Sequence, residues 1–136
     1  MAGTVLAFDF GERRIGVAVG ELALRSAHPL QAIDARDNET RFASIARLIE
    51  EWKPGRAVVG LPAPERAEHP MNHRCRKFAR QLEGRFGLVA DLIDESYSSA
   101  VAEADLAAAG LKAERRKAVL DSVAAQAILQ TWFERQ

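Results

Sequence analysis

Two acidic positions follow apolar runs at points where an isolated charge is costly. Asp9 lies near the end of the apolar run 4–10, and a carboxylate among apolar neighbours costs free energy unless a partner compensates it. Asp94 and Glu95 end a second run, and ligands gather at the carboxyl ends of strands in open α/β sheets. Because adjacent strand residues face opposite ways, only one of this pair can point into a given site. The structural alternatives are a turn aspartate at position 9 and an ordinary polar strand exit at 94–95.

A third carboxylate interrupts the apolar stripe of the last predicted helix, 118–134. Asp121, Ala125, Ile128 and Trp132 share one face of that helix, because they are spaced by four, three and four residues. The other three members are apolar, so the stripe should face a sheet and Asp121 should point inward. The helix dipole favours an acid in the first turn, but it does not account for the inward face.

Three acids from distant segments predict one shared metal site. Clustered carboxylates repel one another and resist ionisation, and a divalent cation removes this difficulty. Mg²⁺ and Mn²⁺ prefer oxygen ligands and keep open positions for phosphate and water. Two such ions about 4 Å apart can activate water and stabilise the leaving oxygen of a phosphodiester. The predicted chemistry is therefore metal-assisted hydrolysis of phosphodiester bonds.

The elements that must position these acids follow from the spacing of apolar residues. Short apolar runs bounded by Gly or Pro predict strands, and apolar residues at intervals of three and four predict helices. The predicted strands are 4–10, 15–19, 24–33, 56–61 and 88–93. The predicted helices run from a cap at 37 or 38 to the stop at 54–55, then over 70–86, 98–109 and 118–134, with a charged connector at 112–117. Pro29 marks the third strand as an edge or a bulge.

The order of these elements predicts an α/β fold. Three successive strands form an antiparallel meander, and the later strands alternate with helices, which requires parallel crossovers. The expected architecture is a mixed five-stranded sheet, three antiparallel strands followed by parallel strands, with helices on both faces. The whole chain, 1–136, is expected to form one domain.

The composition is that of a globular protein and predicts a cytoplasmic location. The 19 basic and 19 acidic residues give a net charge of zero, which neither demands nor excludes a nucleic-acid partner. The single cysteine, Cys75, excludes an internal disulfide, and its place on the apolar stripe of helix 70–86 favours a core position over a nucleophile. No secretory leader or membrane-length apolar run is visible in the sequence. We expect a monomer or a weak dimer.

Two clusters of basic residues are candidates for phosphate contact. We favour the connector 112–117, which leads directly to Asp121 and can neutralise phosphates despite the zero net charge. Its basic residues are Lys112, Arg115, Arg116 and Lys117. For the basic residues of helix 70–86, phosphate contact and a solvated helix face remain open.

In the order of its motifs, the chain resembles the YqgF family. Members of that family are RNase H-like proteins related to Holliday junction resolvases and are considered nucleases of pre-16S ribosomal RNA. The motifs that carry the resemblance are Leu6-Ala7-Phe8-Asp9-Phe10-Gly11, Arg14-Ile15-Gly16-Val17-Ala18-Val19-Gly20, Val58-Val59-Gly60-Leu61-Pro62, Arg76-Lys77-Phe78-Ala79, Asp94-Glu95 and Asp121-Ser122 with Ala124-Ala125. Each motif is short, but the ordered set spans nearly the whole chain.

The resemblance implies an RNase H-like fold and assigns the site residues. Asp9, Glu95 and Asp121 are expected to be the catalytic, metal-binding acids, with Mg²⁺ or Mn²⁺ as cofactor, and Arg14 joins the substrate-binding candidates. The expected substrate is precursor ribosomal RNA, with an association with the ribosome. The chain departs from the family pattern at Ser96, where Arg is usual, at Glu12, and in the loop 63–69.

Two alternatives remain open at this stage. The same metal chemistry serves resolution of branched DNA, as in a Holliday junction resolvase. An RNase H-like domain can also act as a non-catalytic nucleic-acid-binding module, although the presence of all three acids argues against that. An actin-like ATPase shares an Asp-x-Gly hairpin but needs two lobes, and 136 residues allow only one.

Overall fold

The computed structural model describes residues 3–61, 70–94, 110 and 113–136. The strands are β1 Thr4–Asp9, β2 Arg14–Glu21, β3 Ser26–Asp34, β4 Arg56–Leu61 and β5 Val89–Asp94. The helices are α1 Asn38–Trp52, α2 Pro70–Phe86 and α4 Ala113–Glu134. No helix among the described residues is long and apolar enough to cross a membrane.

The strands form one mixed sheet in the order β3-β2-β1-β4-β5. β1, β2 and β3 pair antiparallel, whereas β4 pairs parallel with β1 and with β5. Pro29 lies in the edge strand β3, opposite Ala18, where the missing N–H of proline is tolerated. This topology confirms the predicted mixed five-stranded sheet.

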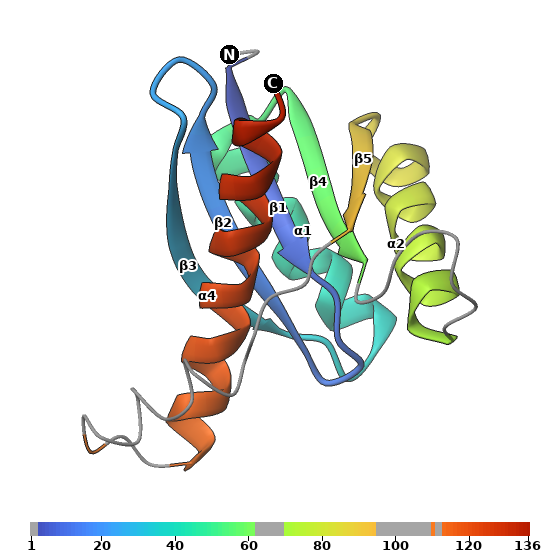
Figure 1. Cartoon of the computed structure of the whole chain (residues 1–136). Helices are drawn as coiled ribbons and strands as arrows, with labels where there is room; N and C mark the ends of the chain where they lie inside the picture. Colours follow the sequence, from blue (N-terminus) through green and yellow to red (C-terminus); the bar gives the residue numbers. More distant parts are fainter. Residues whose placement is uncertain (1–2, 62–69, 95–109, 111–112) are drawn as a thin grey trace.

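Helices cover both faces of the sheet (Figure 1), as predicted. α4 packs on one face, over β1, β2 and β3, and its core includes Val5 and Ala7 of β1. α1 and α2 cover the other face, where Leu6 and Phe8 are buried. Successive residues of β1 thus feed two separate cores, which explains why this strand reads as a continuous apolar run.

The first helix begins and ends where its local sequence predicts. The Asp37 side chain accepts a hydrogen bond from the Thr40 N–H at 2.8 Å, which satisfies one of the free donors of the first turn of α1. Hydrogen bonds from Thr40 hold the pKa of Asp37 below its usual value. Lys53 adopts the left-handed conformation at φ 46°, and Pro54 follows it, so the helix stops there.

The boundaries of two elements differ from the prediction. α4 begins at Ala113, so residues 113–117 are helical and the predicted charged connector is wrong for that stretch. The sequence Ala113-Glu114-Arg115-Arg116-Lys117 contains only strong helix formers, and their charge does not oppose helix formation. Asp121 therefore lies in the helix interior, beyond the first turn.

β3 begins at Ser26, two residues later than predicted, because Arg25 adopts a left-handed turn conformation at φ 52°. The predicted helix 98–109 lies outside the described residues.

A glycine inside α2 offers a simple test of helix stability. Gly84 is exposed, and a Cβ built on it meets no atom within 4 Å. Gly84→Ala should raise the free energy of unfolding by about 0.5–1 kcal/mol, because alanine loses less backbone entropy on entering a helix. Urea denaturation followed by circular dichroism measures this, and a lower unfolding midpoint would contradict the prediction.

Candidate active site

Asp9 and Asp121 come together through a shared neighbour, Gly16. Asp9 lies opposite Gly16 in the antiparallel pairing of β1 with β2. A Cβ on Gly16 would lie 1.8 Å from the carbonyl oxygen of Asp121, which is far inside contact distance. α4 therefore touches β2 at the very residue that pairs with Asp9, and the two acidic residues are spatial neighbours although they lie far apart in the sequence.

The Asp9 carboxylate lies at the rim of the sheet, where β1 ends. Val5 and Ala7 point into the core under α4, and the alternation of β1 puts Asp9 on the same side. Its charge also acts across the end of the sheet on Cys75 of α2. Asp9 is therefore placed at the end of β1, on the side of the sheet that α4 covers, and its charge also reaches Cys75 in the other helical layer. The carboxyl end of a strand in an α/β sheet is where ligands commonly bind.

Asp121 is held by Arg14, the first residue of β2. The Arg14 Nε donates to Asp121 Oδ2 at 2.7 Å, and the two side chains are 37% and 27% exposed. An ion pair this accessible adds roughly 0–1 kcal/mol to stability, so its main effect is on the orientation of the Asp121 side chain. The arginine supplies part of the compensation that an inward-facing carboxylate requires.

A row of polar side chains fixes α4 against the edge strand β3, and sequence reasoning missed it. Ser122 Oγ donates to the Leu30 carbonyl oxygen at 2.5 Å, and Gln126 Nε2 donates to the Ala27 carbonyl oxygen at 2.9 Å. Gln130 Nε2 donates to the carbonyl oxygen of the turn residue before β3 at 3.1 Å. The spacing of 122, 126 and 130 by four residues was a readable signal of one polar helix face. This row positions Asp121 because Ser122 is its direct neighbour.

The last residues of β5 divide between the two faces of the sheet. Ile93 belongs to the core under α4. Asp94 pairs with Leu61, whose side chain lies in the opposite core, so Asp94 is on the side away from α4 and is exposed. Of the predicted pair, Asp94 is thus directed away from the side chain of Asp121. Glu95, the predicted third acid, lies outside the described residues.

Asp91 has a structural role near the other end of β5. Its carboxylate accepts hydrogen bonds from Arg56 Nη1 at 2.9 Å and from Trp132 Nε1 at 3.0 Å. These contacts join β4, β5 and the last turns of α4. The indole N–H of a buried tryptophan thereby obtains its partner, and Asp91 serves to connect these elements.

Cys75 is buried in the core, as predicted, and is 1% exposed. Burial, with a smaller contribution from the Asp9 charge, raises the pKa of its thiol from 9.0 to about 11. The thiolate is the reactive species, so this cysteine stays protonated and inert at neutral pH. It serves as packing beside the site rather than as a nucleophile.

The raised pKa of Cys75 predicts slow alkylation in the folded state. At pH 8 the thiolate fraction falls about 100-fold when the pKa rises from 9.0 to about 11. Iodoacetamide should therefore modify Cys75 at least about 100-fold more slowly in the folded protein than in urea at the same pH. Because the folded-state pKa is the higher one, the thiol's contribution to stability is present below pH 9.0 and is lost towards pH 11. Equal alkylation rates would contradict this assignment.

The predicted substrate-binding residues are distributed over several places. Arg14 is at the site itself, and Lys117 is exposed on α4. Arg115 and Arg116 belong to the first turns of α4, and Lys112 lies outside the described residues. In α2, Arg74 forms an ion pair with Glu12 of the β1–β2 turn.

A polar hollow opens directly beside the Arg14–Asp121 pair. It is lined by the β1–β2 turn, the end of β3 and the segment before α1, through residues Glu12, Arg13, Arg14, Gln31, Ala32, Asp34 and Arg36. Arg36 donates to Asp34 at 2.7 Å, which lowers the pKa of Asp34. Three arginines therefore line one surface depression, in which Arg36 is paired with Asp34 and Arg14 with Asp121. Guanidinium is well suited to bidentate phosphate binding.

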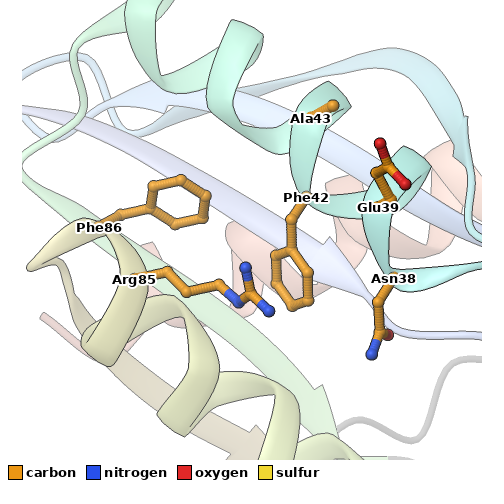
Figure 2. Close-up of a pocket in the computed structure, with 6 residues that line it drawn as sticks. All are labelled: Asn38, Glu39, Phe42, Ala43, Arg85 and Phe86. Atoms are coloured by element: carbon orange, nitrogen blue, oxygen red, sulfur yellow. The ribbon is translucent and has the colours of Figure 1, made fainter.

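A second hollow, between α1 and α2, has the wrong character for phosphoryl chemistry. Figure 2 shows the Arg85 side chain extending across the Phe42 ring, with its guanidinium carbon 4.0 Å from the ring centre. Phe86 and Glu39 also line this hollow. Phe42 and Phe86 belong to the core on the side away from α4. We interpret this hollow as the junction of two helices.

The described part of the site fits a hard divalent cation through its donor set. Asp9 and Asp121 supply carboxylate oxygens, the ligands that Mg²⁺ and Mn²⁺ prefer. Within the described residues, no group of three His, Cys, Asp or Glu side chains is close enough to hold a metal ion. The acid needed to complete a three-carboxylate site was predicted at Glu95.

Comparison with known proteins decides the family. Residues 3–135 match the RuvX family, which is described as Holliday junction resolvase. This chain belongs to the RuvX family. A RuvX relative from Methylobacillus flagellatus is 56% identical over 133 residues, covering 97% of this chain and 91% of the relative. A second, from Chromobacterium violaceum, is 56% identical over 131 residues, covering 95% of this chain and 96% of the relative. Both bear the name "Putative pre-16S rRNA nuclease", and the resemblance to the YqgF family is confirmed.

Solved structures confirm the RNase H-like fold of this RuvX-family chain. T. thermophilus RuvC in complex with a Holliday junction substrate aligns with a TM-score of 0.57 at 15% identity, covering 97% of this chain and 94% of RuvC. The fowlpox virus Holliday junction resolvase aligns with a TM-score of 0.55 at 13% identity, covering 98% of this chain and 99% of the resolvase. At these identities the likeness concerns the fold, and the site must be argued from this chain's own residues.

Proposed function

We propose that this chain is a metal-dependent endonuclease that hydrolyses phosphodiester bonds in the processing of the 5′ end of pre-16S ribosomal RNA. The observation that carries the proposal is the meeting of Asp9 and Asp121 across Gly16, at the carboxyl end of β1. The family membership supports nuclease chemistry at this place. The names of the relatives support the choice of substrate.

Asp9, Glu95 and Asp121 are the proposed metal ligands. Asp9 and Asp121 approach from β1 and α4, and Glu95 follows directly after β5. The choice of Glu95 over Asp94 is supported by the position of Asp94 on the other side of the sheet. Mg²⁺ or Mn²⁺ bound here would lower the pKa of the attacking water and neutralise charge on the phosphate.

The basic side chains around the acids are proposed to bind the nucleic-acid backbone. Arg13, Arg14 and Arg36 line the polar hollow, where they can donate to the phosphates that flank the cleaved bond. Lys112, Arg115, Arg116 and Lys117, at the start of α4 and just before it, would extend this contact along the strand. Such contacts make binding depend on salt concentration.

Cleavage of defined substrates tests the proposal. We expect the purified protein to cut a transcript containing the 5′ region of pre-16S rRNA when Mg²⁺ or Mn²⁺ is present, and to lose this activity in EDTA. A transcript of mature 16S rRNA sequence serves as the matched control. Undiminished cleavage in EDTA, or absence of cleavage with both metals on every substrate, would contradict the proposal.

Resolution of branched DNA is the second candidate, because the matching family is described as Holliday junction resolvase. The same three acids would serve either substrate, so the chemistry does not choose between them. Parallel assays on precursor RNA and on a four-way DNA junction at equal concentrations separate the two. Preference for the junction would move the assignment to DNA.

The proposed function also implies a cellular location and a partner. Processing of precursor ribosomal RNA requires a protein in the cytoplasm that meets the assembling small subunit. Co-sedimentation of the protein with precursor particles, in contrast to mature subunits, tests this association. The predicted oligomeric state, a monomer or a weak dimer, is tested by sedimentation velocity across a range of protein concentrations.

A further inference from the structure

Arg14 lies between two possible partners, the Asp121 carboxylate and a ligand in the polar hollow. Its Nε donates to Asp121 Oδ2 at 2.7 Å, so it competes with a divalent cation for one of the two carboxylate oxygens. The same side chain lines the polar hollow beside the site, together with Arg13 and Arg36. It can therefore face either the carboxylate or a ligand in the hollow.

Electrostatics opposes simultaneous occupation of Asp121 by both cations. A divalent ion on Asp121 would lie within a few ångströms of the guanidinium, and two positive charges at that distance repel even at the high effective dielectric of a protein surface. The Arg14 side chain is 37% exposed and lines the open hollow, so it has space to move away from the carboxylate. The partly exposed ion pair that it gives up contributes little to stability.

We propose that Arg14 is a positioning residue that alternates between Asp121 and the phosphate backbone of the substrate. This inference rests on the proposed function. Without metal, Arg14 pairs with Asp121 and holds the carboxylate in a fixed orientation. When a divalent ion takes Asp121, the guanidinium is released into the hollow beside Arg13 and binds a phosphate there.

The alternation makes metal and nucleic acid bind cooperatively. Metal binding frees a phosphate ligand, and phosphate binding withdraws a competitor from Asp121, so each should strengthen the other. It also keeps metal affinity low until substrate is present. A residue that only stabilised the fold would produce neither effect.

The test compares metal binding by two variants with the same loss of charge. Arg14→Gln removes the competing guanidinium, while Arg13→Gln removes a neighbouring exposed charge that lines the same hollow. Titration of Mn²⁺ without nucleic acid, followed by electron paramagnetic resonance of free Mn²⁺, gives the dissociation constants. Arg14→Gln should bind Mn²⁺ about fivefold to tenfold more tightly than the wild type, and Arg13→Gln should differ by less than about twofold.

A second measurement examines the coupling between metal binding and RNA binding. The affinity for a fluorescent single-stranded RNA is measured by anisotropy, with Ca²⁺ replacing Mg²⁺ to suppress cleavage. Ca²⁺ should strengthen RNA binding by the wild type and by Arg13→Gln, and this enhancement should be lost in Arg14→Gln. Circular dichroism establishes that all three proteins have the same fold.

The possible outcomes distinguish a failure of the proposed role of Arg14 from a failure of the proposed function. If the wild type binds Mn²⁺ and Arg14→Gln binds it equally or more weakly, the alternation of Arg14 is overturned while the metal site stands. If neither the wild type nor Arg14→Gln binds Mn²⁺, in the absence or in the presence of RNA, the proposed function fails and this inference fails with it. Equal tightening in Arg13→Gln and Arg14→Gln would show a general charge effect and would also overturn the alternation.

Discussion

Asp9→Asn is expected to abolish metal-dependent cleavage while the protein stays folded. The substitution keeps the size of the side chain and removes the charge that is proposed to hold a divalent ion at the end of β1. Metal stabilisation of the charge developing on phosphate is worth several kcal/mol, and a loss of about 4 kcal/mol corresponds to about a thousandfold in rate. We therefore expect the rate of single-turnover cleavage to fall by at least about a thousandfold.

Asp94→Asn is the matched control for this experiment. Asp94 also ends a strand of the same sheet, but it is exposed and lies on the side away from α4. Its rate of cleavage should stay within about threefold of the wild type, because it lies outside the proposed ligand set. Circular dichroism and thermal melting establish that both variants are folded. A fully active Asp9→Asn, or equal losses in the two variants, would remove Asp9 from the proposed site.

Gly16→Ala is expected to lower the stability of the protein strongly, because the added methyl group would overlap the backbone of α4. The added Cβ would lie 1.8 Å from the Asp121 carbonyl oxygen and 2.3 Å from its carbonyl carbon. Backbone atoms cannot rotate aside, so α4 must move away from β2 by about 1 Å or more to restore normal contact. Overpacking of this kind costs typically 1–3 kcal/mol, and we expect about 3 kcal/mol here.

The same substitution should also damage activity, because Asp121 moves with the helix backbone. A displacement of about 1 Å in a catalytic group can cost about 100-fold in rate. Urea denaturation measures the stability, and cleavage is assayed at a temperature where the variant remains folded. Gly84→Ala, which adds the same methyl group where nothing lies within 4 Å, is the control and should be fully active. A Gly16→Ala variant with unchanged stability and rate would show that α4 does not approach β2 this closely.

The order of the elements was predictable because each carries a local signal. The apolar run 56–61 and the stripe of helix 70–86 correspond to β4 and α2, whose bounds are Arg56–Leu61 and Pro70–Phe86. Helix-capping and helix-breaking residues act within a few positions of a helix end, so their effect can be read from a single sequence. The beginning of α4 differs from the prediction because the charge of residues 113–117 does not distinguish a loop from an exposed helix, and those residues favour a helix.

The acidic residues of the proposed site could be singled out from the sequence, whereas their contacts could not. Asp9 and Asp121 could be singled out because each is a charge in an apolar pattern. Their meeting depends on the close approach of α4 to Gly16, a tertiary contact that leaves no local mark beyond the absence of a side chain. The Arg14–Asp121 pair likewise joins two segments that no periodicity connects.

The polar row on α4 has a consequence for behaviour at high protein concentration. Edge strands invite pairing with other chains, which leads to strand exchange and aggregates. β3 is the long edge of this sheet, and Pro29 removes one of its amide donors, while Ser122 and Gln126 engage two of its carbonyl acceptors. These three positions leave a neighbouring molecule fewer backbone donors and acceptors to pair with along this edge. Substituting the two side chains together should therefore shorten the shelf life of concentrated solutions before it affects the fold of the individual molecule.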